Sequence, residues 1–242
     1  MWGLSLFSCF FLGGYVFKKS GKDEEQVTII IQYVFIFGLI GSRLAHILFY
    51  QLDYYTAHPE DILAVWKGGL ASHGGVVGGL IGLYIYCRRN KDYDFFWTLD
   101  HGIIGVMLLA SFIRFGNLMN SELYGRPTNA PWGFVFEQVD NIPRHPVVLY
   151  ESVAYLLIQI FMLYLFKKYR ESKPGIYLVV FLVLVFSVRF LLEFFKEPDG
   201  QMLGLISKTQ ALNLPFIIAG TVLLYFVARG KLRYKQPAYG KV

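Results

Sequence analysis

The sequence predicts an all-α, polytopic membrane protein, and three observations support this fold class. The chain of 242 residues is 55% hydrophobic, only 17% of its residues are charged, and its mean hydropathy is +0.45. A soluble domain needs roughly a quarter of its residues charged, and a disordered chain contains few apolar residues. Long apolar runs recur without the strict alternation of barrel strands, so we expect the spans to be helices.

Seven apolar segments define the expected helices in chain order. They cover roughly residues 2–17, 27–49, 68–87, 95–116, 146–166, 174–194 and 211–228. Most reach the roughly 20 residues that cross a hydrocarbon core, while the first and last are shorter. No basic residue precedes the first segment, as a signal peptide would require, so we interpret it as a helix. We therefore expect about seven transmembrane helices in a single integral-membrane domain spanning residues 1–242.

Lysine and arginine residues are distributed unequally between the two sets of loops. Fifteen of the 23 follow the first, third, fifth and seventh segments, whereas five lie in the alternate loops. Because cytoplasmic loops are rich in these residues, we expect the N-terminus outside and the C-terminus in the cytoplasm. The longest loop, at about residues 117–145, is then external. Its turn formers and aromatic residues indicate an ordered cap.

The charge and the cysteines exclude several other classes. The net charge of +6 does not indicate nucleic-acid binding, because the basic residues form short clusters between apolar runs. Cys9, Cys87 and the histidines have no spacing typical of metal ligands. We therefore expect no metal, no cofactor and no nucleic acid, and the lipid bilayer is the first expected partner.

Three arginines lie inside the apolar segments. With a rise of ~1.5 Å per residue, Arg43 lies ~24 Å, Arg114 ~28 Å and Arg189 ~22 Å along helices that run outward. His73 lies ~8 Å below the outer boundary on a helix that runs inward. Glu193 follows Arg189 by one turn on the same helix face. Charged groups in lipid cost ~2.5 kcal/mol or more, so these residues are candidates for a functional site in the outer leaflet.

Each of these groups also has a structural explanation. An arginine near a helix end can extend to the interface, and Arg189 and Glu193 can form an i,i+4 ion pair. The six glycines between residues 68 and 79 favour close helix packing, and His73 among them can be a core histidine. Similar depth on four helices favours a shared ligand instead. Guanidinium groups bind phosphate in a bidentate manner, and imidazole can serve as a general base.

Four motifs stand in the chain in a fixed order: Gly68–Gly75 around His73, Arg114–Arg126, His145–Glu151 and Arg189–Asp199. Together they closely resemble the prolipoprotein diacylglyceryl transferases of bacteria, over nearly the whole chain. The resemblance implies a seven-helix, multi-pass catalytic domain in the bacterial plasma (inner) membrane, with its active site toward the outer leaflet. It implies transfer of diacylglyceryl from phosphatidylglycerol to the lipobox cysteine of a prolipoprotein signal peptide. Glycerol 1-phosphate is then released.

The resemblance also implies roles for individual residues. The expected catalytic residues are His73, Arg114 and Arg189. The expected substrate-binding residues are Arg114, Asn117, Asn120, Glu122, Gly125, Arg126 and Glu193. We hypothesise that His73, assisted by Glu193 or Glu122, accepts the proton of the substrate thiol.

Two alternatives stay open at this point. Ile113, Val185 and Asn213 depart from the residues that are usual in the family, so a diverged member could use another lipid or acceptor. A transporter of anionic solutes would also place Arg and His within helices. Such a transporter predicts polar groups in both leaflets and repeated halves, and the sequence shows neither.

Overall fold

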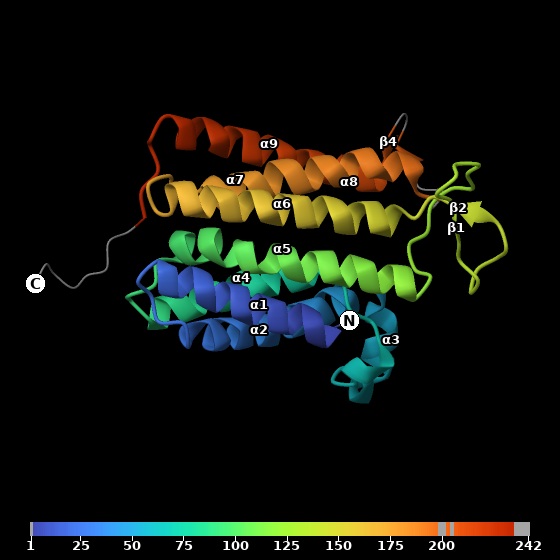
Figure 1. Ribbon diagram of the computed structural model, residues 1–242. Coiled ribbons are helices and arrows are strands. Elements are labelled where there is room, and N and C mark those ends of the chain that lie inside the picture. Colours follow the sequence, from blue (N-terminus) through green and yellow to red (C-terminus); the bar gives the residue numbers. More distant parts are fainter. Residues whose placement is uncertain (1, 198–201, 204–205, 235–242) are drawn as a thin grey trace, which may run out of the picture. The chain divides into compact units, whose positions relative to one another are not determined.

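The computed structural model describes residues 2–197, 202–203 and 206–234 (Figure 1). These residues form two compact units, which are described separately below. Unit 1 comprises the described residues of Met1–Lys22 together with Leu99–Tyr234, and unit 2 comprises Asp23–Thr98. Four residues of the sequence-based predictions, namely Pro198, Asp199, Lys235 and Lys241, lie outside the described residues.

Long helices dominate unit 1. They are α1 (Trp2–Lys19), α5 (Phe95–Met119, whose first four residues belong to unit 2), α6 (Val147–Tyr169) and α9 (Lys208–Ala228). A further segment runs continuously through α7 (Ile176–Val180), a π-helical turn (Phe181–Val185), α8 (Phe186–Leu192) and a 3-10 turn (Glu193–Phe195). Among the described residues, two short antiparallel strand pairs join β1 (Phe134–Val135) to β2 (Pro143–Arg144) and β3 (Met202–Leu203) to β4 (Ile206–Ser207).

The helices of unit 1 pack side by side through both apolar and polar contacts (Figure 1). Between α5 and α6, the Ser111 hydroxyl donates to the Ser152 carbonyl at 2.8 Å, and the Ser152 hydroxyl donates back to the Ser111 carbonyl at 2.9 Å. Between α8 and α9, the rings of Phe186 and Phe216 stack at 4.3 Å. Since lipid offers no hydrogen-bond partners, reciprocal bonding satisfies these buried hydroxyls within the protein.

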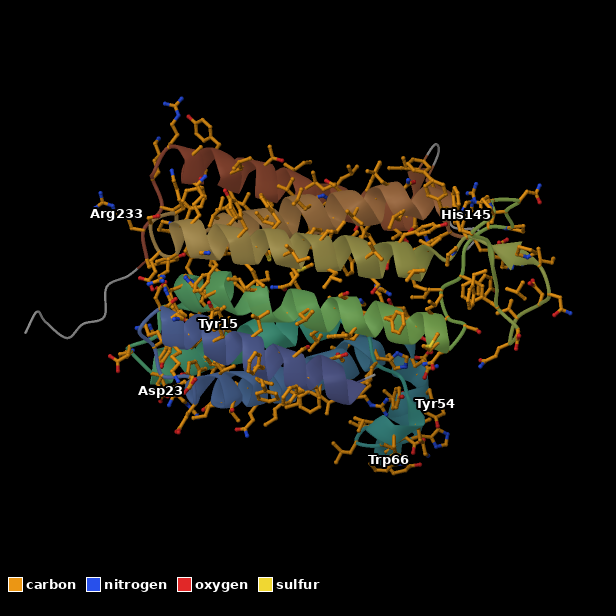
Figure 2. All side chains as sticks on the ribbon, in the orientation of Figure 1. Tyr15, Asp23, Tyr54, Trp66, His145 and Arg233 are labelled. Carbon is orange, nitrogen blue, oxygen red and sulfur yellow. The ribbon has the colours of Figure 1, made fainter. Side chains whose placement is uncertain are left out.

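The two ends of unit 1 differ in character. Figure 2 shows His145 at the end that carries β1 and β2, and Arg233 at the opposite end. At the Arg233 end, the buried carboxylate of Asp100 accepts bonds from the Gly175 amide at 2.9 Å and the Tyr234 hydroxyl at 2.7 Å. The Leu178 amide donates to the same carboxylate at 2.6 Å. Asp100 therefore caps the N-terminus of α7, where a negative charge is favourable.

Unit 2 is built on a close pair of helices, α2 (Gln26–Tyr50) and α4 (Ser72–Arg89). The connection between them contains α3 (Leu52–Ala57) and two 3-10 turns (Pro59–Asp61 and Val65–Lys67). A Cβ atom added to Gly41 would clash with the carbonyl of Gly74, and one added to Gly78 would clash with the carbonyl of Phe37. The glycines therefore allow the two backbones to approach closely, as small residues do in membrane helices.

The all-α membrane fold is confirmed. Among the described residues, five helices are long and apolar enough to cross a membrane: α2, α5, α6, the segment Ile176–Phe195 and α9. The other two predicted spans correspond to α1 and α4, which are helices of 18 residues each. The count of seven spans and the orientation of the termini stay predictions.

Two predicted helix boundaries are wrong. The helix expected from residue 68 begins at Ser72, because Gly68 and Gly69 have φ values of +85° and +75°, in the left-handed region. The helix expected from residue 211 begins at Lys208, because Ser207 and Gln210 form a capping box at its N-terminus.

Replacing Gly78 with alanine should destabilise unit 2. The new methyl group would force α2 and α4 apart at the Phe37 carbonyl, and overpacking of this kind costs about 1–3 kcal/mol. Thermal unfolding of the purified protein measures the effect. Gly79→Ala is the matched control, since its Cβ would lie 3.3 Å from a methyl group of the exposed Val34 side chain and not against a backbone carbonyl at clashing distance. Equal stability of the two variants would contradict the close packing described above.

Candidate active site

A buried carboxylate lies at the centre of the charged groups of unit 1. Glu151, in the first turns of α6, has an exposed fraction of 0%. One of its oxygens lies 2.7 Å from Nε of Arg114 on α5, and the other lies 3.0 Å from Nζ of Lys196. A buried carboxylate is tolerated only where it is paired. Glu151 therefore holds two cations from different segments against one point on α6.

Arg189 on α8 belongs to the same group of charges. Its guanidinium interacts electrostatically with Tyr155, Glu151 and Glu193, and Tyr155 in turn interacts with Arg114. Tyr155 is buried and lies one turn after Glu151 on α6. The two arginines that the sequence placed at similar depth thus gather around one stretch of α6.

Glu193 begins the 3-10 turn that follows α8, so the helix ends just before it. One of its carboxylate oxygens lies 3.4 Å from Nζ of Lys196, and the other accepts a bond from the Ser207 hydroxyl at 3.2 Å. Ser207 is the N-cap of α9. In addition to its interaction with Arg189, Glu193 therefore connects Lys196 to the start of α9.

The residues that follow Arg114 form a hydrogen-bonded group at the end of α5. Nη1 of Arg114 donates to the side-chain oxygen of Asn117 at 3.4 Å, and the Asn117 amide donates to Glu122. The Asn120 amide donates to the other oxygen of Glu122 at 3.2 Å. Ser121 has a φ of +54°, which turns the chain back so that Glu122 meets both amides. Asn117, Asn120 and Glu122 thus lie together next to Arg114.

Gly125 and Arg126 join three separate segments of backbone. The Gly125 amide donates to the His145 carbonyl at 3.0 Å, and the Arg126 amide donates to the Phe195 carbonyl at 2.9 Å. A Cβ atom at Gly125 would lie 2.5 Å from the His145 carbonyl oxygen and 2.6 Å from that of Phe195. Nε of Arg126 donates to the Lys196 carbonyl at 3.0 Å. Both residues thus fix the segment that carries Lys196.

Arg144 connects the cap, at about residues 117–145, to the segment that carries Lys196. It is buried and pairs with Asp140 at 2.7 Å and with Glu197 at 2.7 Å. It also donates to the Gly125 carbonyl at 3.2 Å and lies over the ring of Tyr124 at 4.9 Å. These contacts hold parts of the loop at about residues 117–145, and its external location stays a prediction. The cap's position is therefore coupled to the segment that follows α8.

In unit 2, Arg43 bonds to backbone rather than lying open to a ligand. Its guanidinium donates to five carbonyls between residues 61 and 69, including those of Ile62 at 2.9 Å and Gly68 at 2.6 Å. It also lies 4.9 Å from the ring centre of Tyr55. The sequence predicts a ligand shared by Arg43 and the other buried arginines. The structure instead shows Arg43 organising the connection between α2 and α4.

His73 occupies the first turn of α4. It is exposed, and its ring centre lies 6.1 Å from that of Phe49 and 5.9 Å from that of Tyr50. Because α4 begins at Ser72, the depth estimate that started at residue 68 is wrong for this residue. His73 belongs to unit 2 and the arginine cluster to unit 1, so the meeting of His73 with the arginines stays a prediction.

Glu151 and Lys196 are the site residues without an individual role in the sequence-based prediction. Glu151 could have been found there, since a carboxylate within an apolar segment is a functional candidate by default. Lys196 carries no such signal, because a lysine in an external loop is ordinary. Among the described residues, no group of three or more His, Cys, Asp or Glu side chains is arranged to hold a metal ion.

Comparison with known proteins identifies the family. A family model described as prolipoprotein diacylglyceryl transferase matches residues 1–226. The chain belongs to this family. The relatives include proteins from Tolumonas auensis (42% identity over 96% of this chain and 93% of the relative), Chloroherpeton thalassium (45%, over 87% and 80%) and Bacteroides fragilis (37%, over 96% and 88%). All three are named phosphatidylglycerol–prolipoprotein diacylglyceryl transferase. The resemblance seen in the four motifs is confirmed.

The cap should lose local stability in acid because of Asp140. Hydrogen bonds from Arg144 and from the Ile142 amide lower the pKa of this carboxylate. A lowered pKa stabilises the fold above the unfolded value of ~3.9, and the contribution is lost as the pH falls through the folded value. Hydrogen exchange of cap amides should therefore show protection that is constant near neutral pH and falls below about pH 4.

Asp140→Asn should remove this acid-dependent loss, because the amide does not titrate. Glu137→Gln, at an exposed acid of the same hairpin, is the control and should behave as the wild type. An acid response that is unchanged in Asp140→Asn would show that another group controls the cap.

Proposed function

We propose that this chain transfers the diacylglyceryl group of phosphatidylglycerol to the cysteine thiol of a prolipoprotein lipobox and releases glycerol 1-phosphate. The observation that carries the proposal is the grouping of Arg114 and Arg189 around Glu151, next to the cap of unit 1. Membership of the family supports it, since the relatives bear this activity in their name. No cofactor is part of the proposal.

The reaction needs stabilisation of a leaving phosphate. The substrate thiolate forms a sulfur–carbon bond to the glyceryl carbon, and the bond from that carbon to the phosphate oxygen breaks with its electron pair. The phosphate group then gains negative charge. Arg114 and Arg189 keep their charge even when desolvated and stabilise this oxygen, which is the role of preorganised cations in catalysis.

The surrounding residues hold the lipid headgroup in this proposal. Asn117, Asn120 and Glu122 offer amide and carboxylate groups beside Arg114, which suit the hydroxyls of a glycerol headgroup. Gly125 and Arg126 fix the segment that carries Lys196, and Glu193 orients the end of α8. The proposed binding set is Arg114, Asn117, Asn120, Glu122, Gly125, Arg126 and Glu193.

The thiol proton needs an acceptor, since a free cysteine has a pKa of ~8.5. We assign this role to His73, with Glu193 or Glu122 as a second acceptor. An imidazole in the first turn of α4 is exposed and can exchange its proton with solvent. The signal-peptide helix reaches it from within the bilayer.

The proposed topology has seven spans in a bacterial inner membrane, with the N-terminus outside and the C-terminus in the cytoplasm. Its support is the distribution of charge in unit 1. Lys167 and Lys168 end α6, and Arg229 and Arg233 follow α9. Because basic residues mark the cytoplasmic side, the arginine cluster belongs to the outer leaflet and the cap to the external side. The proposal treats residues 1–242 as one catalytic domain with an external cap at about 117–145.

Purified protein in nanodiscs containing phosphatidylglycerol should convert a lipobox peptide to its diacylglyceryl thioether, which mass spectrometry detects. Arg114→Lys and Arg189→Lys should each lower the rate by about 10²–10³-fold, because an ammonium cannot reproduce the bidentate contact. Arg229→Lys, at the exposed end of α9, is the control and should keep wild-type activity. Full activity of either cluster variant would contradict the proposed role.

His73→Gln should lower the transfer rate at neutral pH and shift the rising limb of the pH–rate profile toward the pKa of the thiol, because the thiolate must then form without a base. His58→Gln is the matched control, since His58 is an exposed histidine of the same unit, with Nδ1 3.3 Å from Glu60. High activity of His73→Gln at neutral pH would remove His73 from the role of base.

A further inference from the structure

The cluster around Glu151 contains an unequal number of positive and negative groups. Among the described residues, three cations (Arg114, Arg189 and Lys196) meet two carboxylates (Glu151 and Glu193), which gives a formal charge of +1. Glu122 and Arg126, which are exposed on the adjoining segment, have opposite signs and contribute no net charge. The formal charge of the site equals the charge of a phosphodiester, with the sign reversed.

We propose that Glu151 sets the charge preference of this site, so that the site favours a phosphodiester monoanion over a phosphomonoester dianion. This inference rests on the proposed function and deepens it. The substrate lipid is a phosphodiester with one negative charge, and it neutralises the cluster. The phosphomonoester product has nearly two negative charges at neutral pH. While it is bound, the cluster and the product together carry about one excess negative charge.

Because Glu151 is buried, this charge mismatch has a large effect on the binding of the product. Its carboxylate is shielded from water and contacts Arg114 and Lys196 together. At an effective dielectric constant near 20, a unit charge a few ångströms away changes binding by more than tenfold, far more than in water. The product therefore leaves for the aqueous side, where the dianion is well hydrated. The carboxylate favours product release, and the guanidinium groups still stabilise the breaking bond locally.

Glu193 does not serve this purpose in the same way. Its second oxygen accepts a bond from Ser207, so it also connects the cluster to α9. Glu151 contacts Arg114 directly, and Arg114 is the group proposed to touch the phosphate. Glu151 is thus a residue that determines specificity through Arg114 and Lys196 rather than a catalytic residue.

A structural role for Glu151 makes a different prediction. If its carboxylate only held Arg114 in place, its loss would weaken the binding of phosphodiester and phosphomonoester alike. If it sets the charge, its loss raises the formal charge to +2 and strengthens the binding of the dianion more than that of the monoanion. The ratio of the two affinities separates these roles.

The experiment uses the full chain in nanodiscs and isothermal titration calorimetry at about pH 8, where glycerol phosphate is a dianion. The probes are glycerol 1-phosphate and its diester glycerophosphoglycerol. Wild-type protein should bind the diester at least as tightly as glycerol 1-phosphate, because the diester neutralises the cluster whereas the monoester leaves it with excess negative charge. Glu151→Gln should bind both probes more tightly than wild type, but the gain should be larger for glycerol 1-phosphate by about tenfold or more, because the removed charge repels a dianion about twice as strongly as a monoanion.

Two controls complete the test. Glu151→Asp keeps the charge and should restore the wild-type ratio, whereas Glu137→Gln, in the exposed part of the cap, should leave both ratio and activity unchanged. Parallel loss of both affinities in Glu151→Gln overturns the proposal. If that variant does not fold, the wild type alone decides, since a tenfold preference for the dianion would also overturn it. Formation of the peptide adduct by wild type tests the proposed function independently of this ratio.

Discussion

The contact of one buried carboxylate with two cations determines the arrangement of the site. Glu151 has no access to water, so Arg114 and Lys196 must reach it from α5 and from the segment after α8. Breaking a buried ion pair by removing one partner is far more costly than the loss of an exposed ion pair. The ends of α5, α6 and α8 are therefore held in a fixed relation by electrostatics as well as by packing.

The cap and the loops around the site hold Lys196 in position for its contact with Glu151. Arg126 donates to the carbonyls of Phe195 and Lys196 through its backbone amide and its side chain, and Arg144 pairs with Glu197. Each contact fixes the short segment that carries the Lys196 ammonium to Glu151. These contacts thus set the position of the Lys196 ammonium relative to Glu151.

The sequence predicted the helices well and the contacts of individual side chains less well. Apolar runs of about 20 residues predict helices long enough to span, so hydropathy located the long helices, while the left-handed glycines at 68 and 69 shifted one boundary by four residues. Arg114 and Arg189 were predictable because charge in lipid is rare. Arg43 is also a charged residue within an apolar segment, but its guanidinium donates to backbone carbonyls. The sequence does not show this, because it depends on the path of residues 61–69.

The bonding of Tyr234 to Asp100 has a practical consequence for handling the protein. The Tyr234 hydroxyl completes the set of donors around the carboxylate that starts α7, although it lies beyond α9. Truncations designed from hydropathy alone would stop at the end of α9 and remove it. An affinity tag or fluorescent fusion should accordingly be attached downstream of this tyrosine, so that the recombinant product retains the clasp at the start of α7.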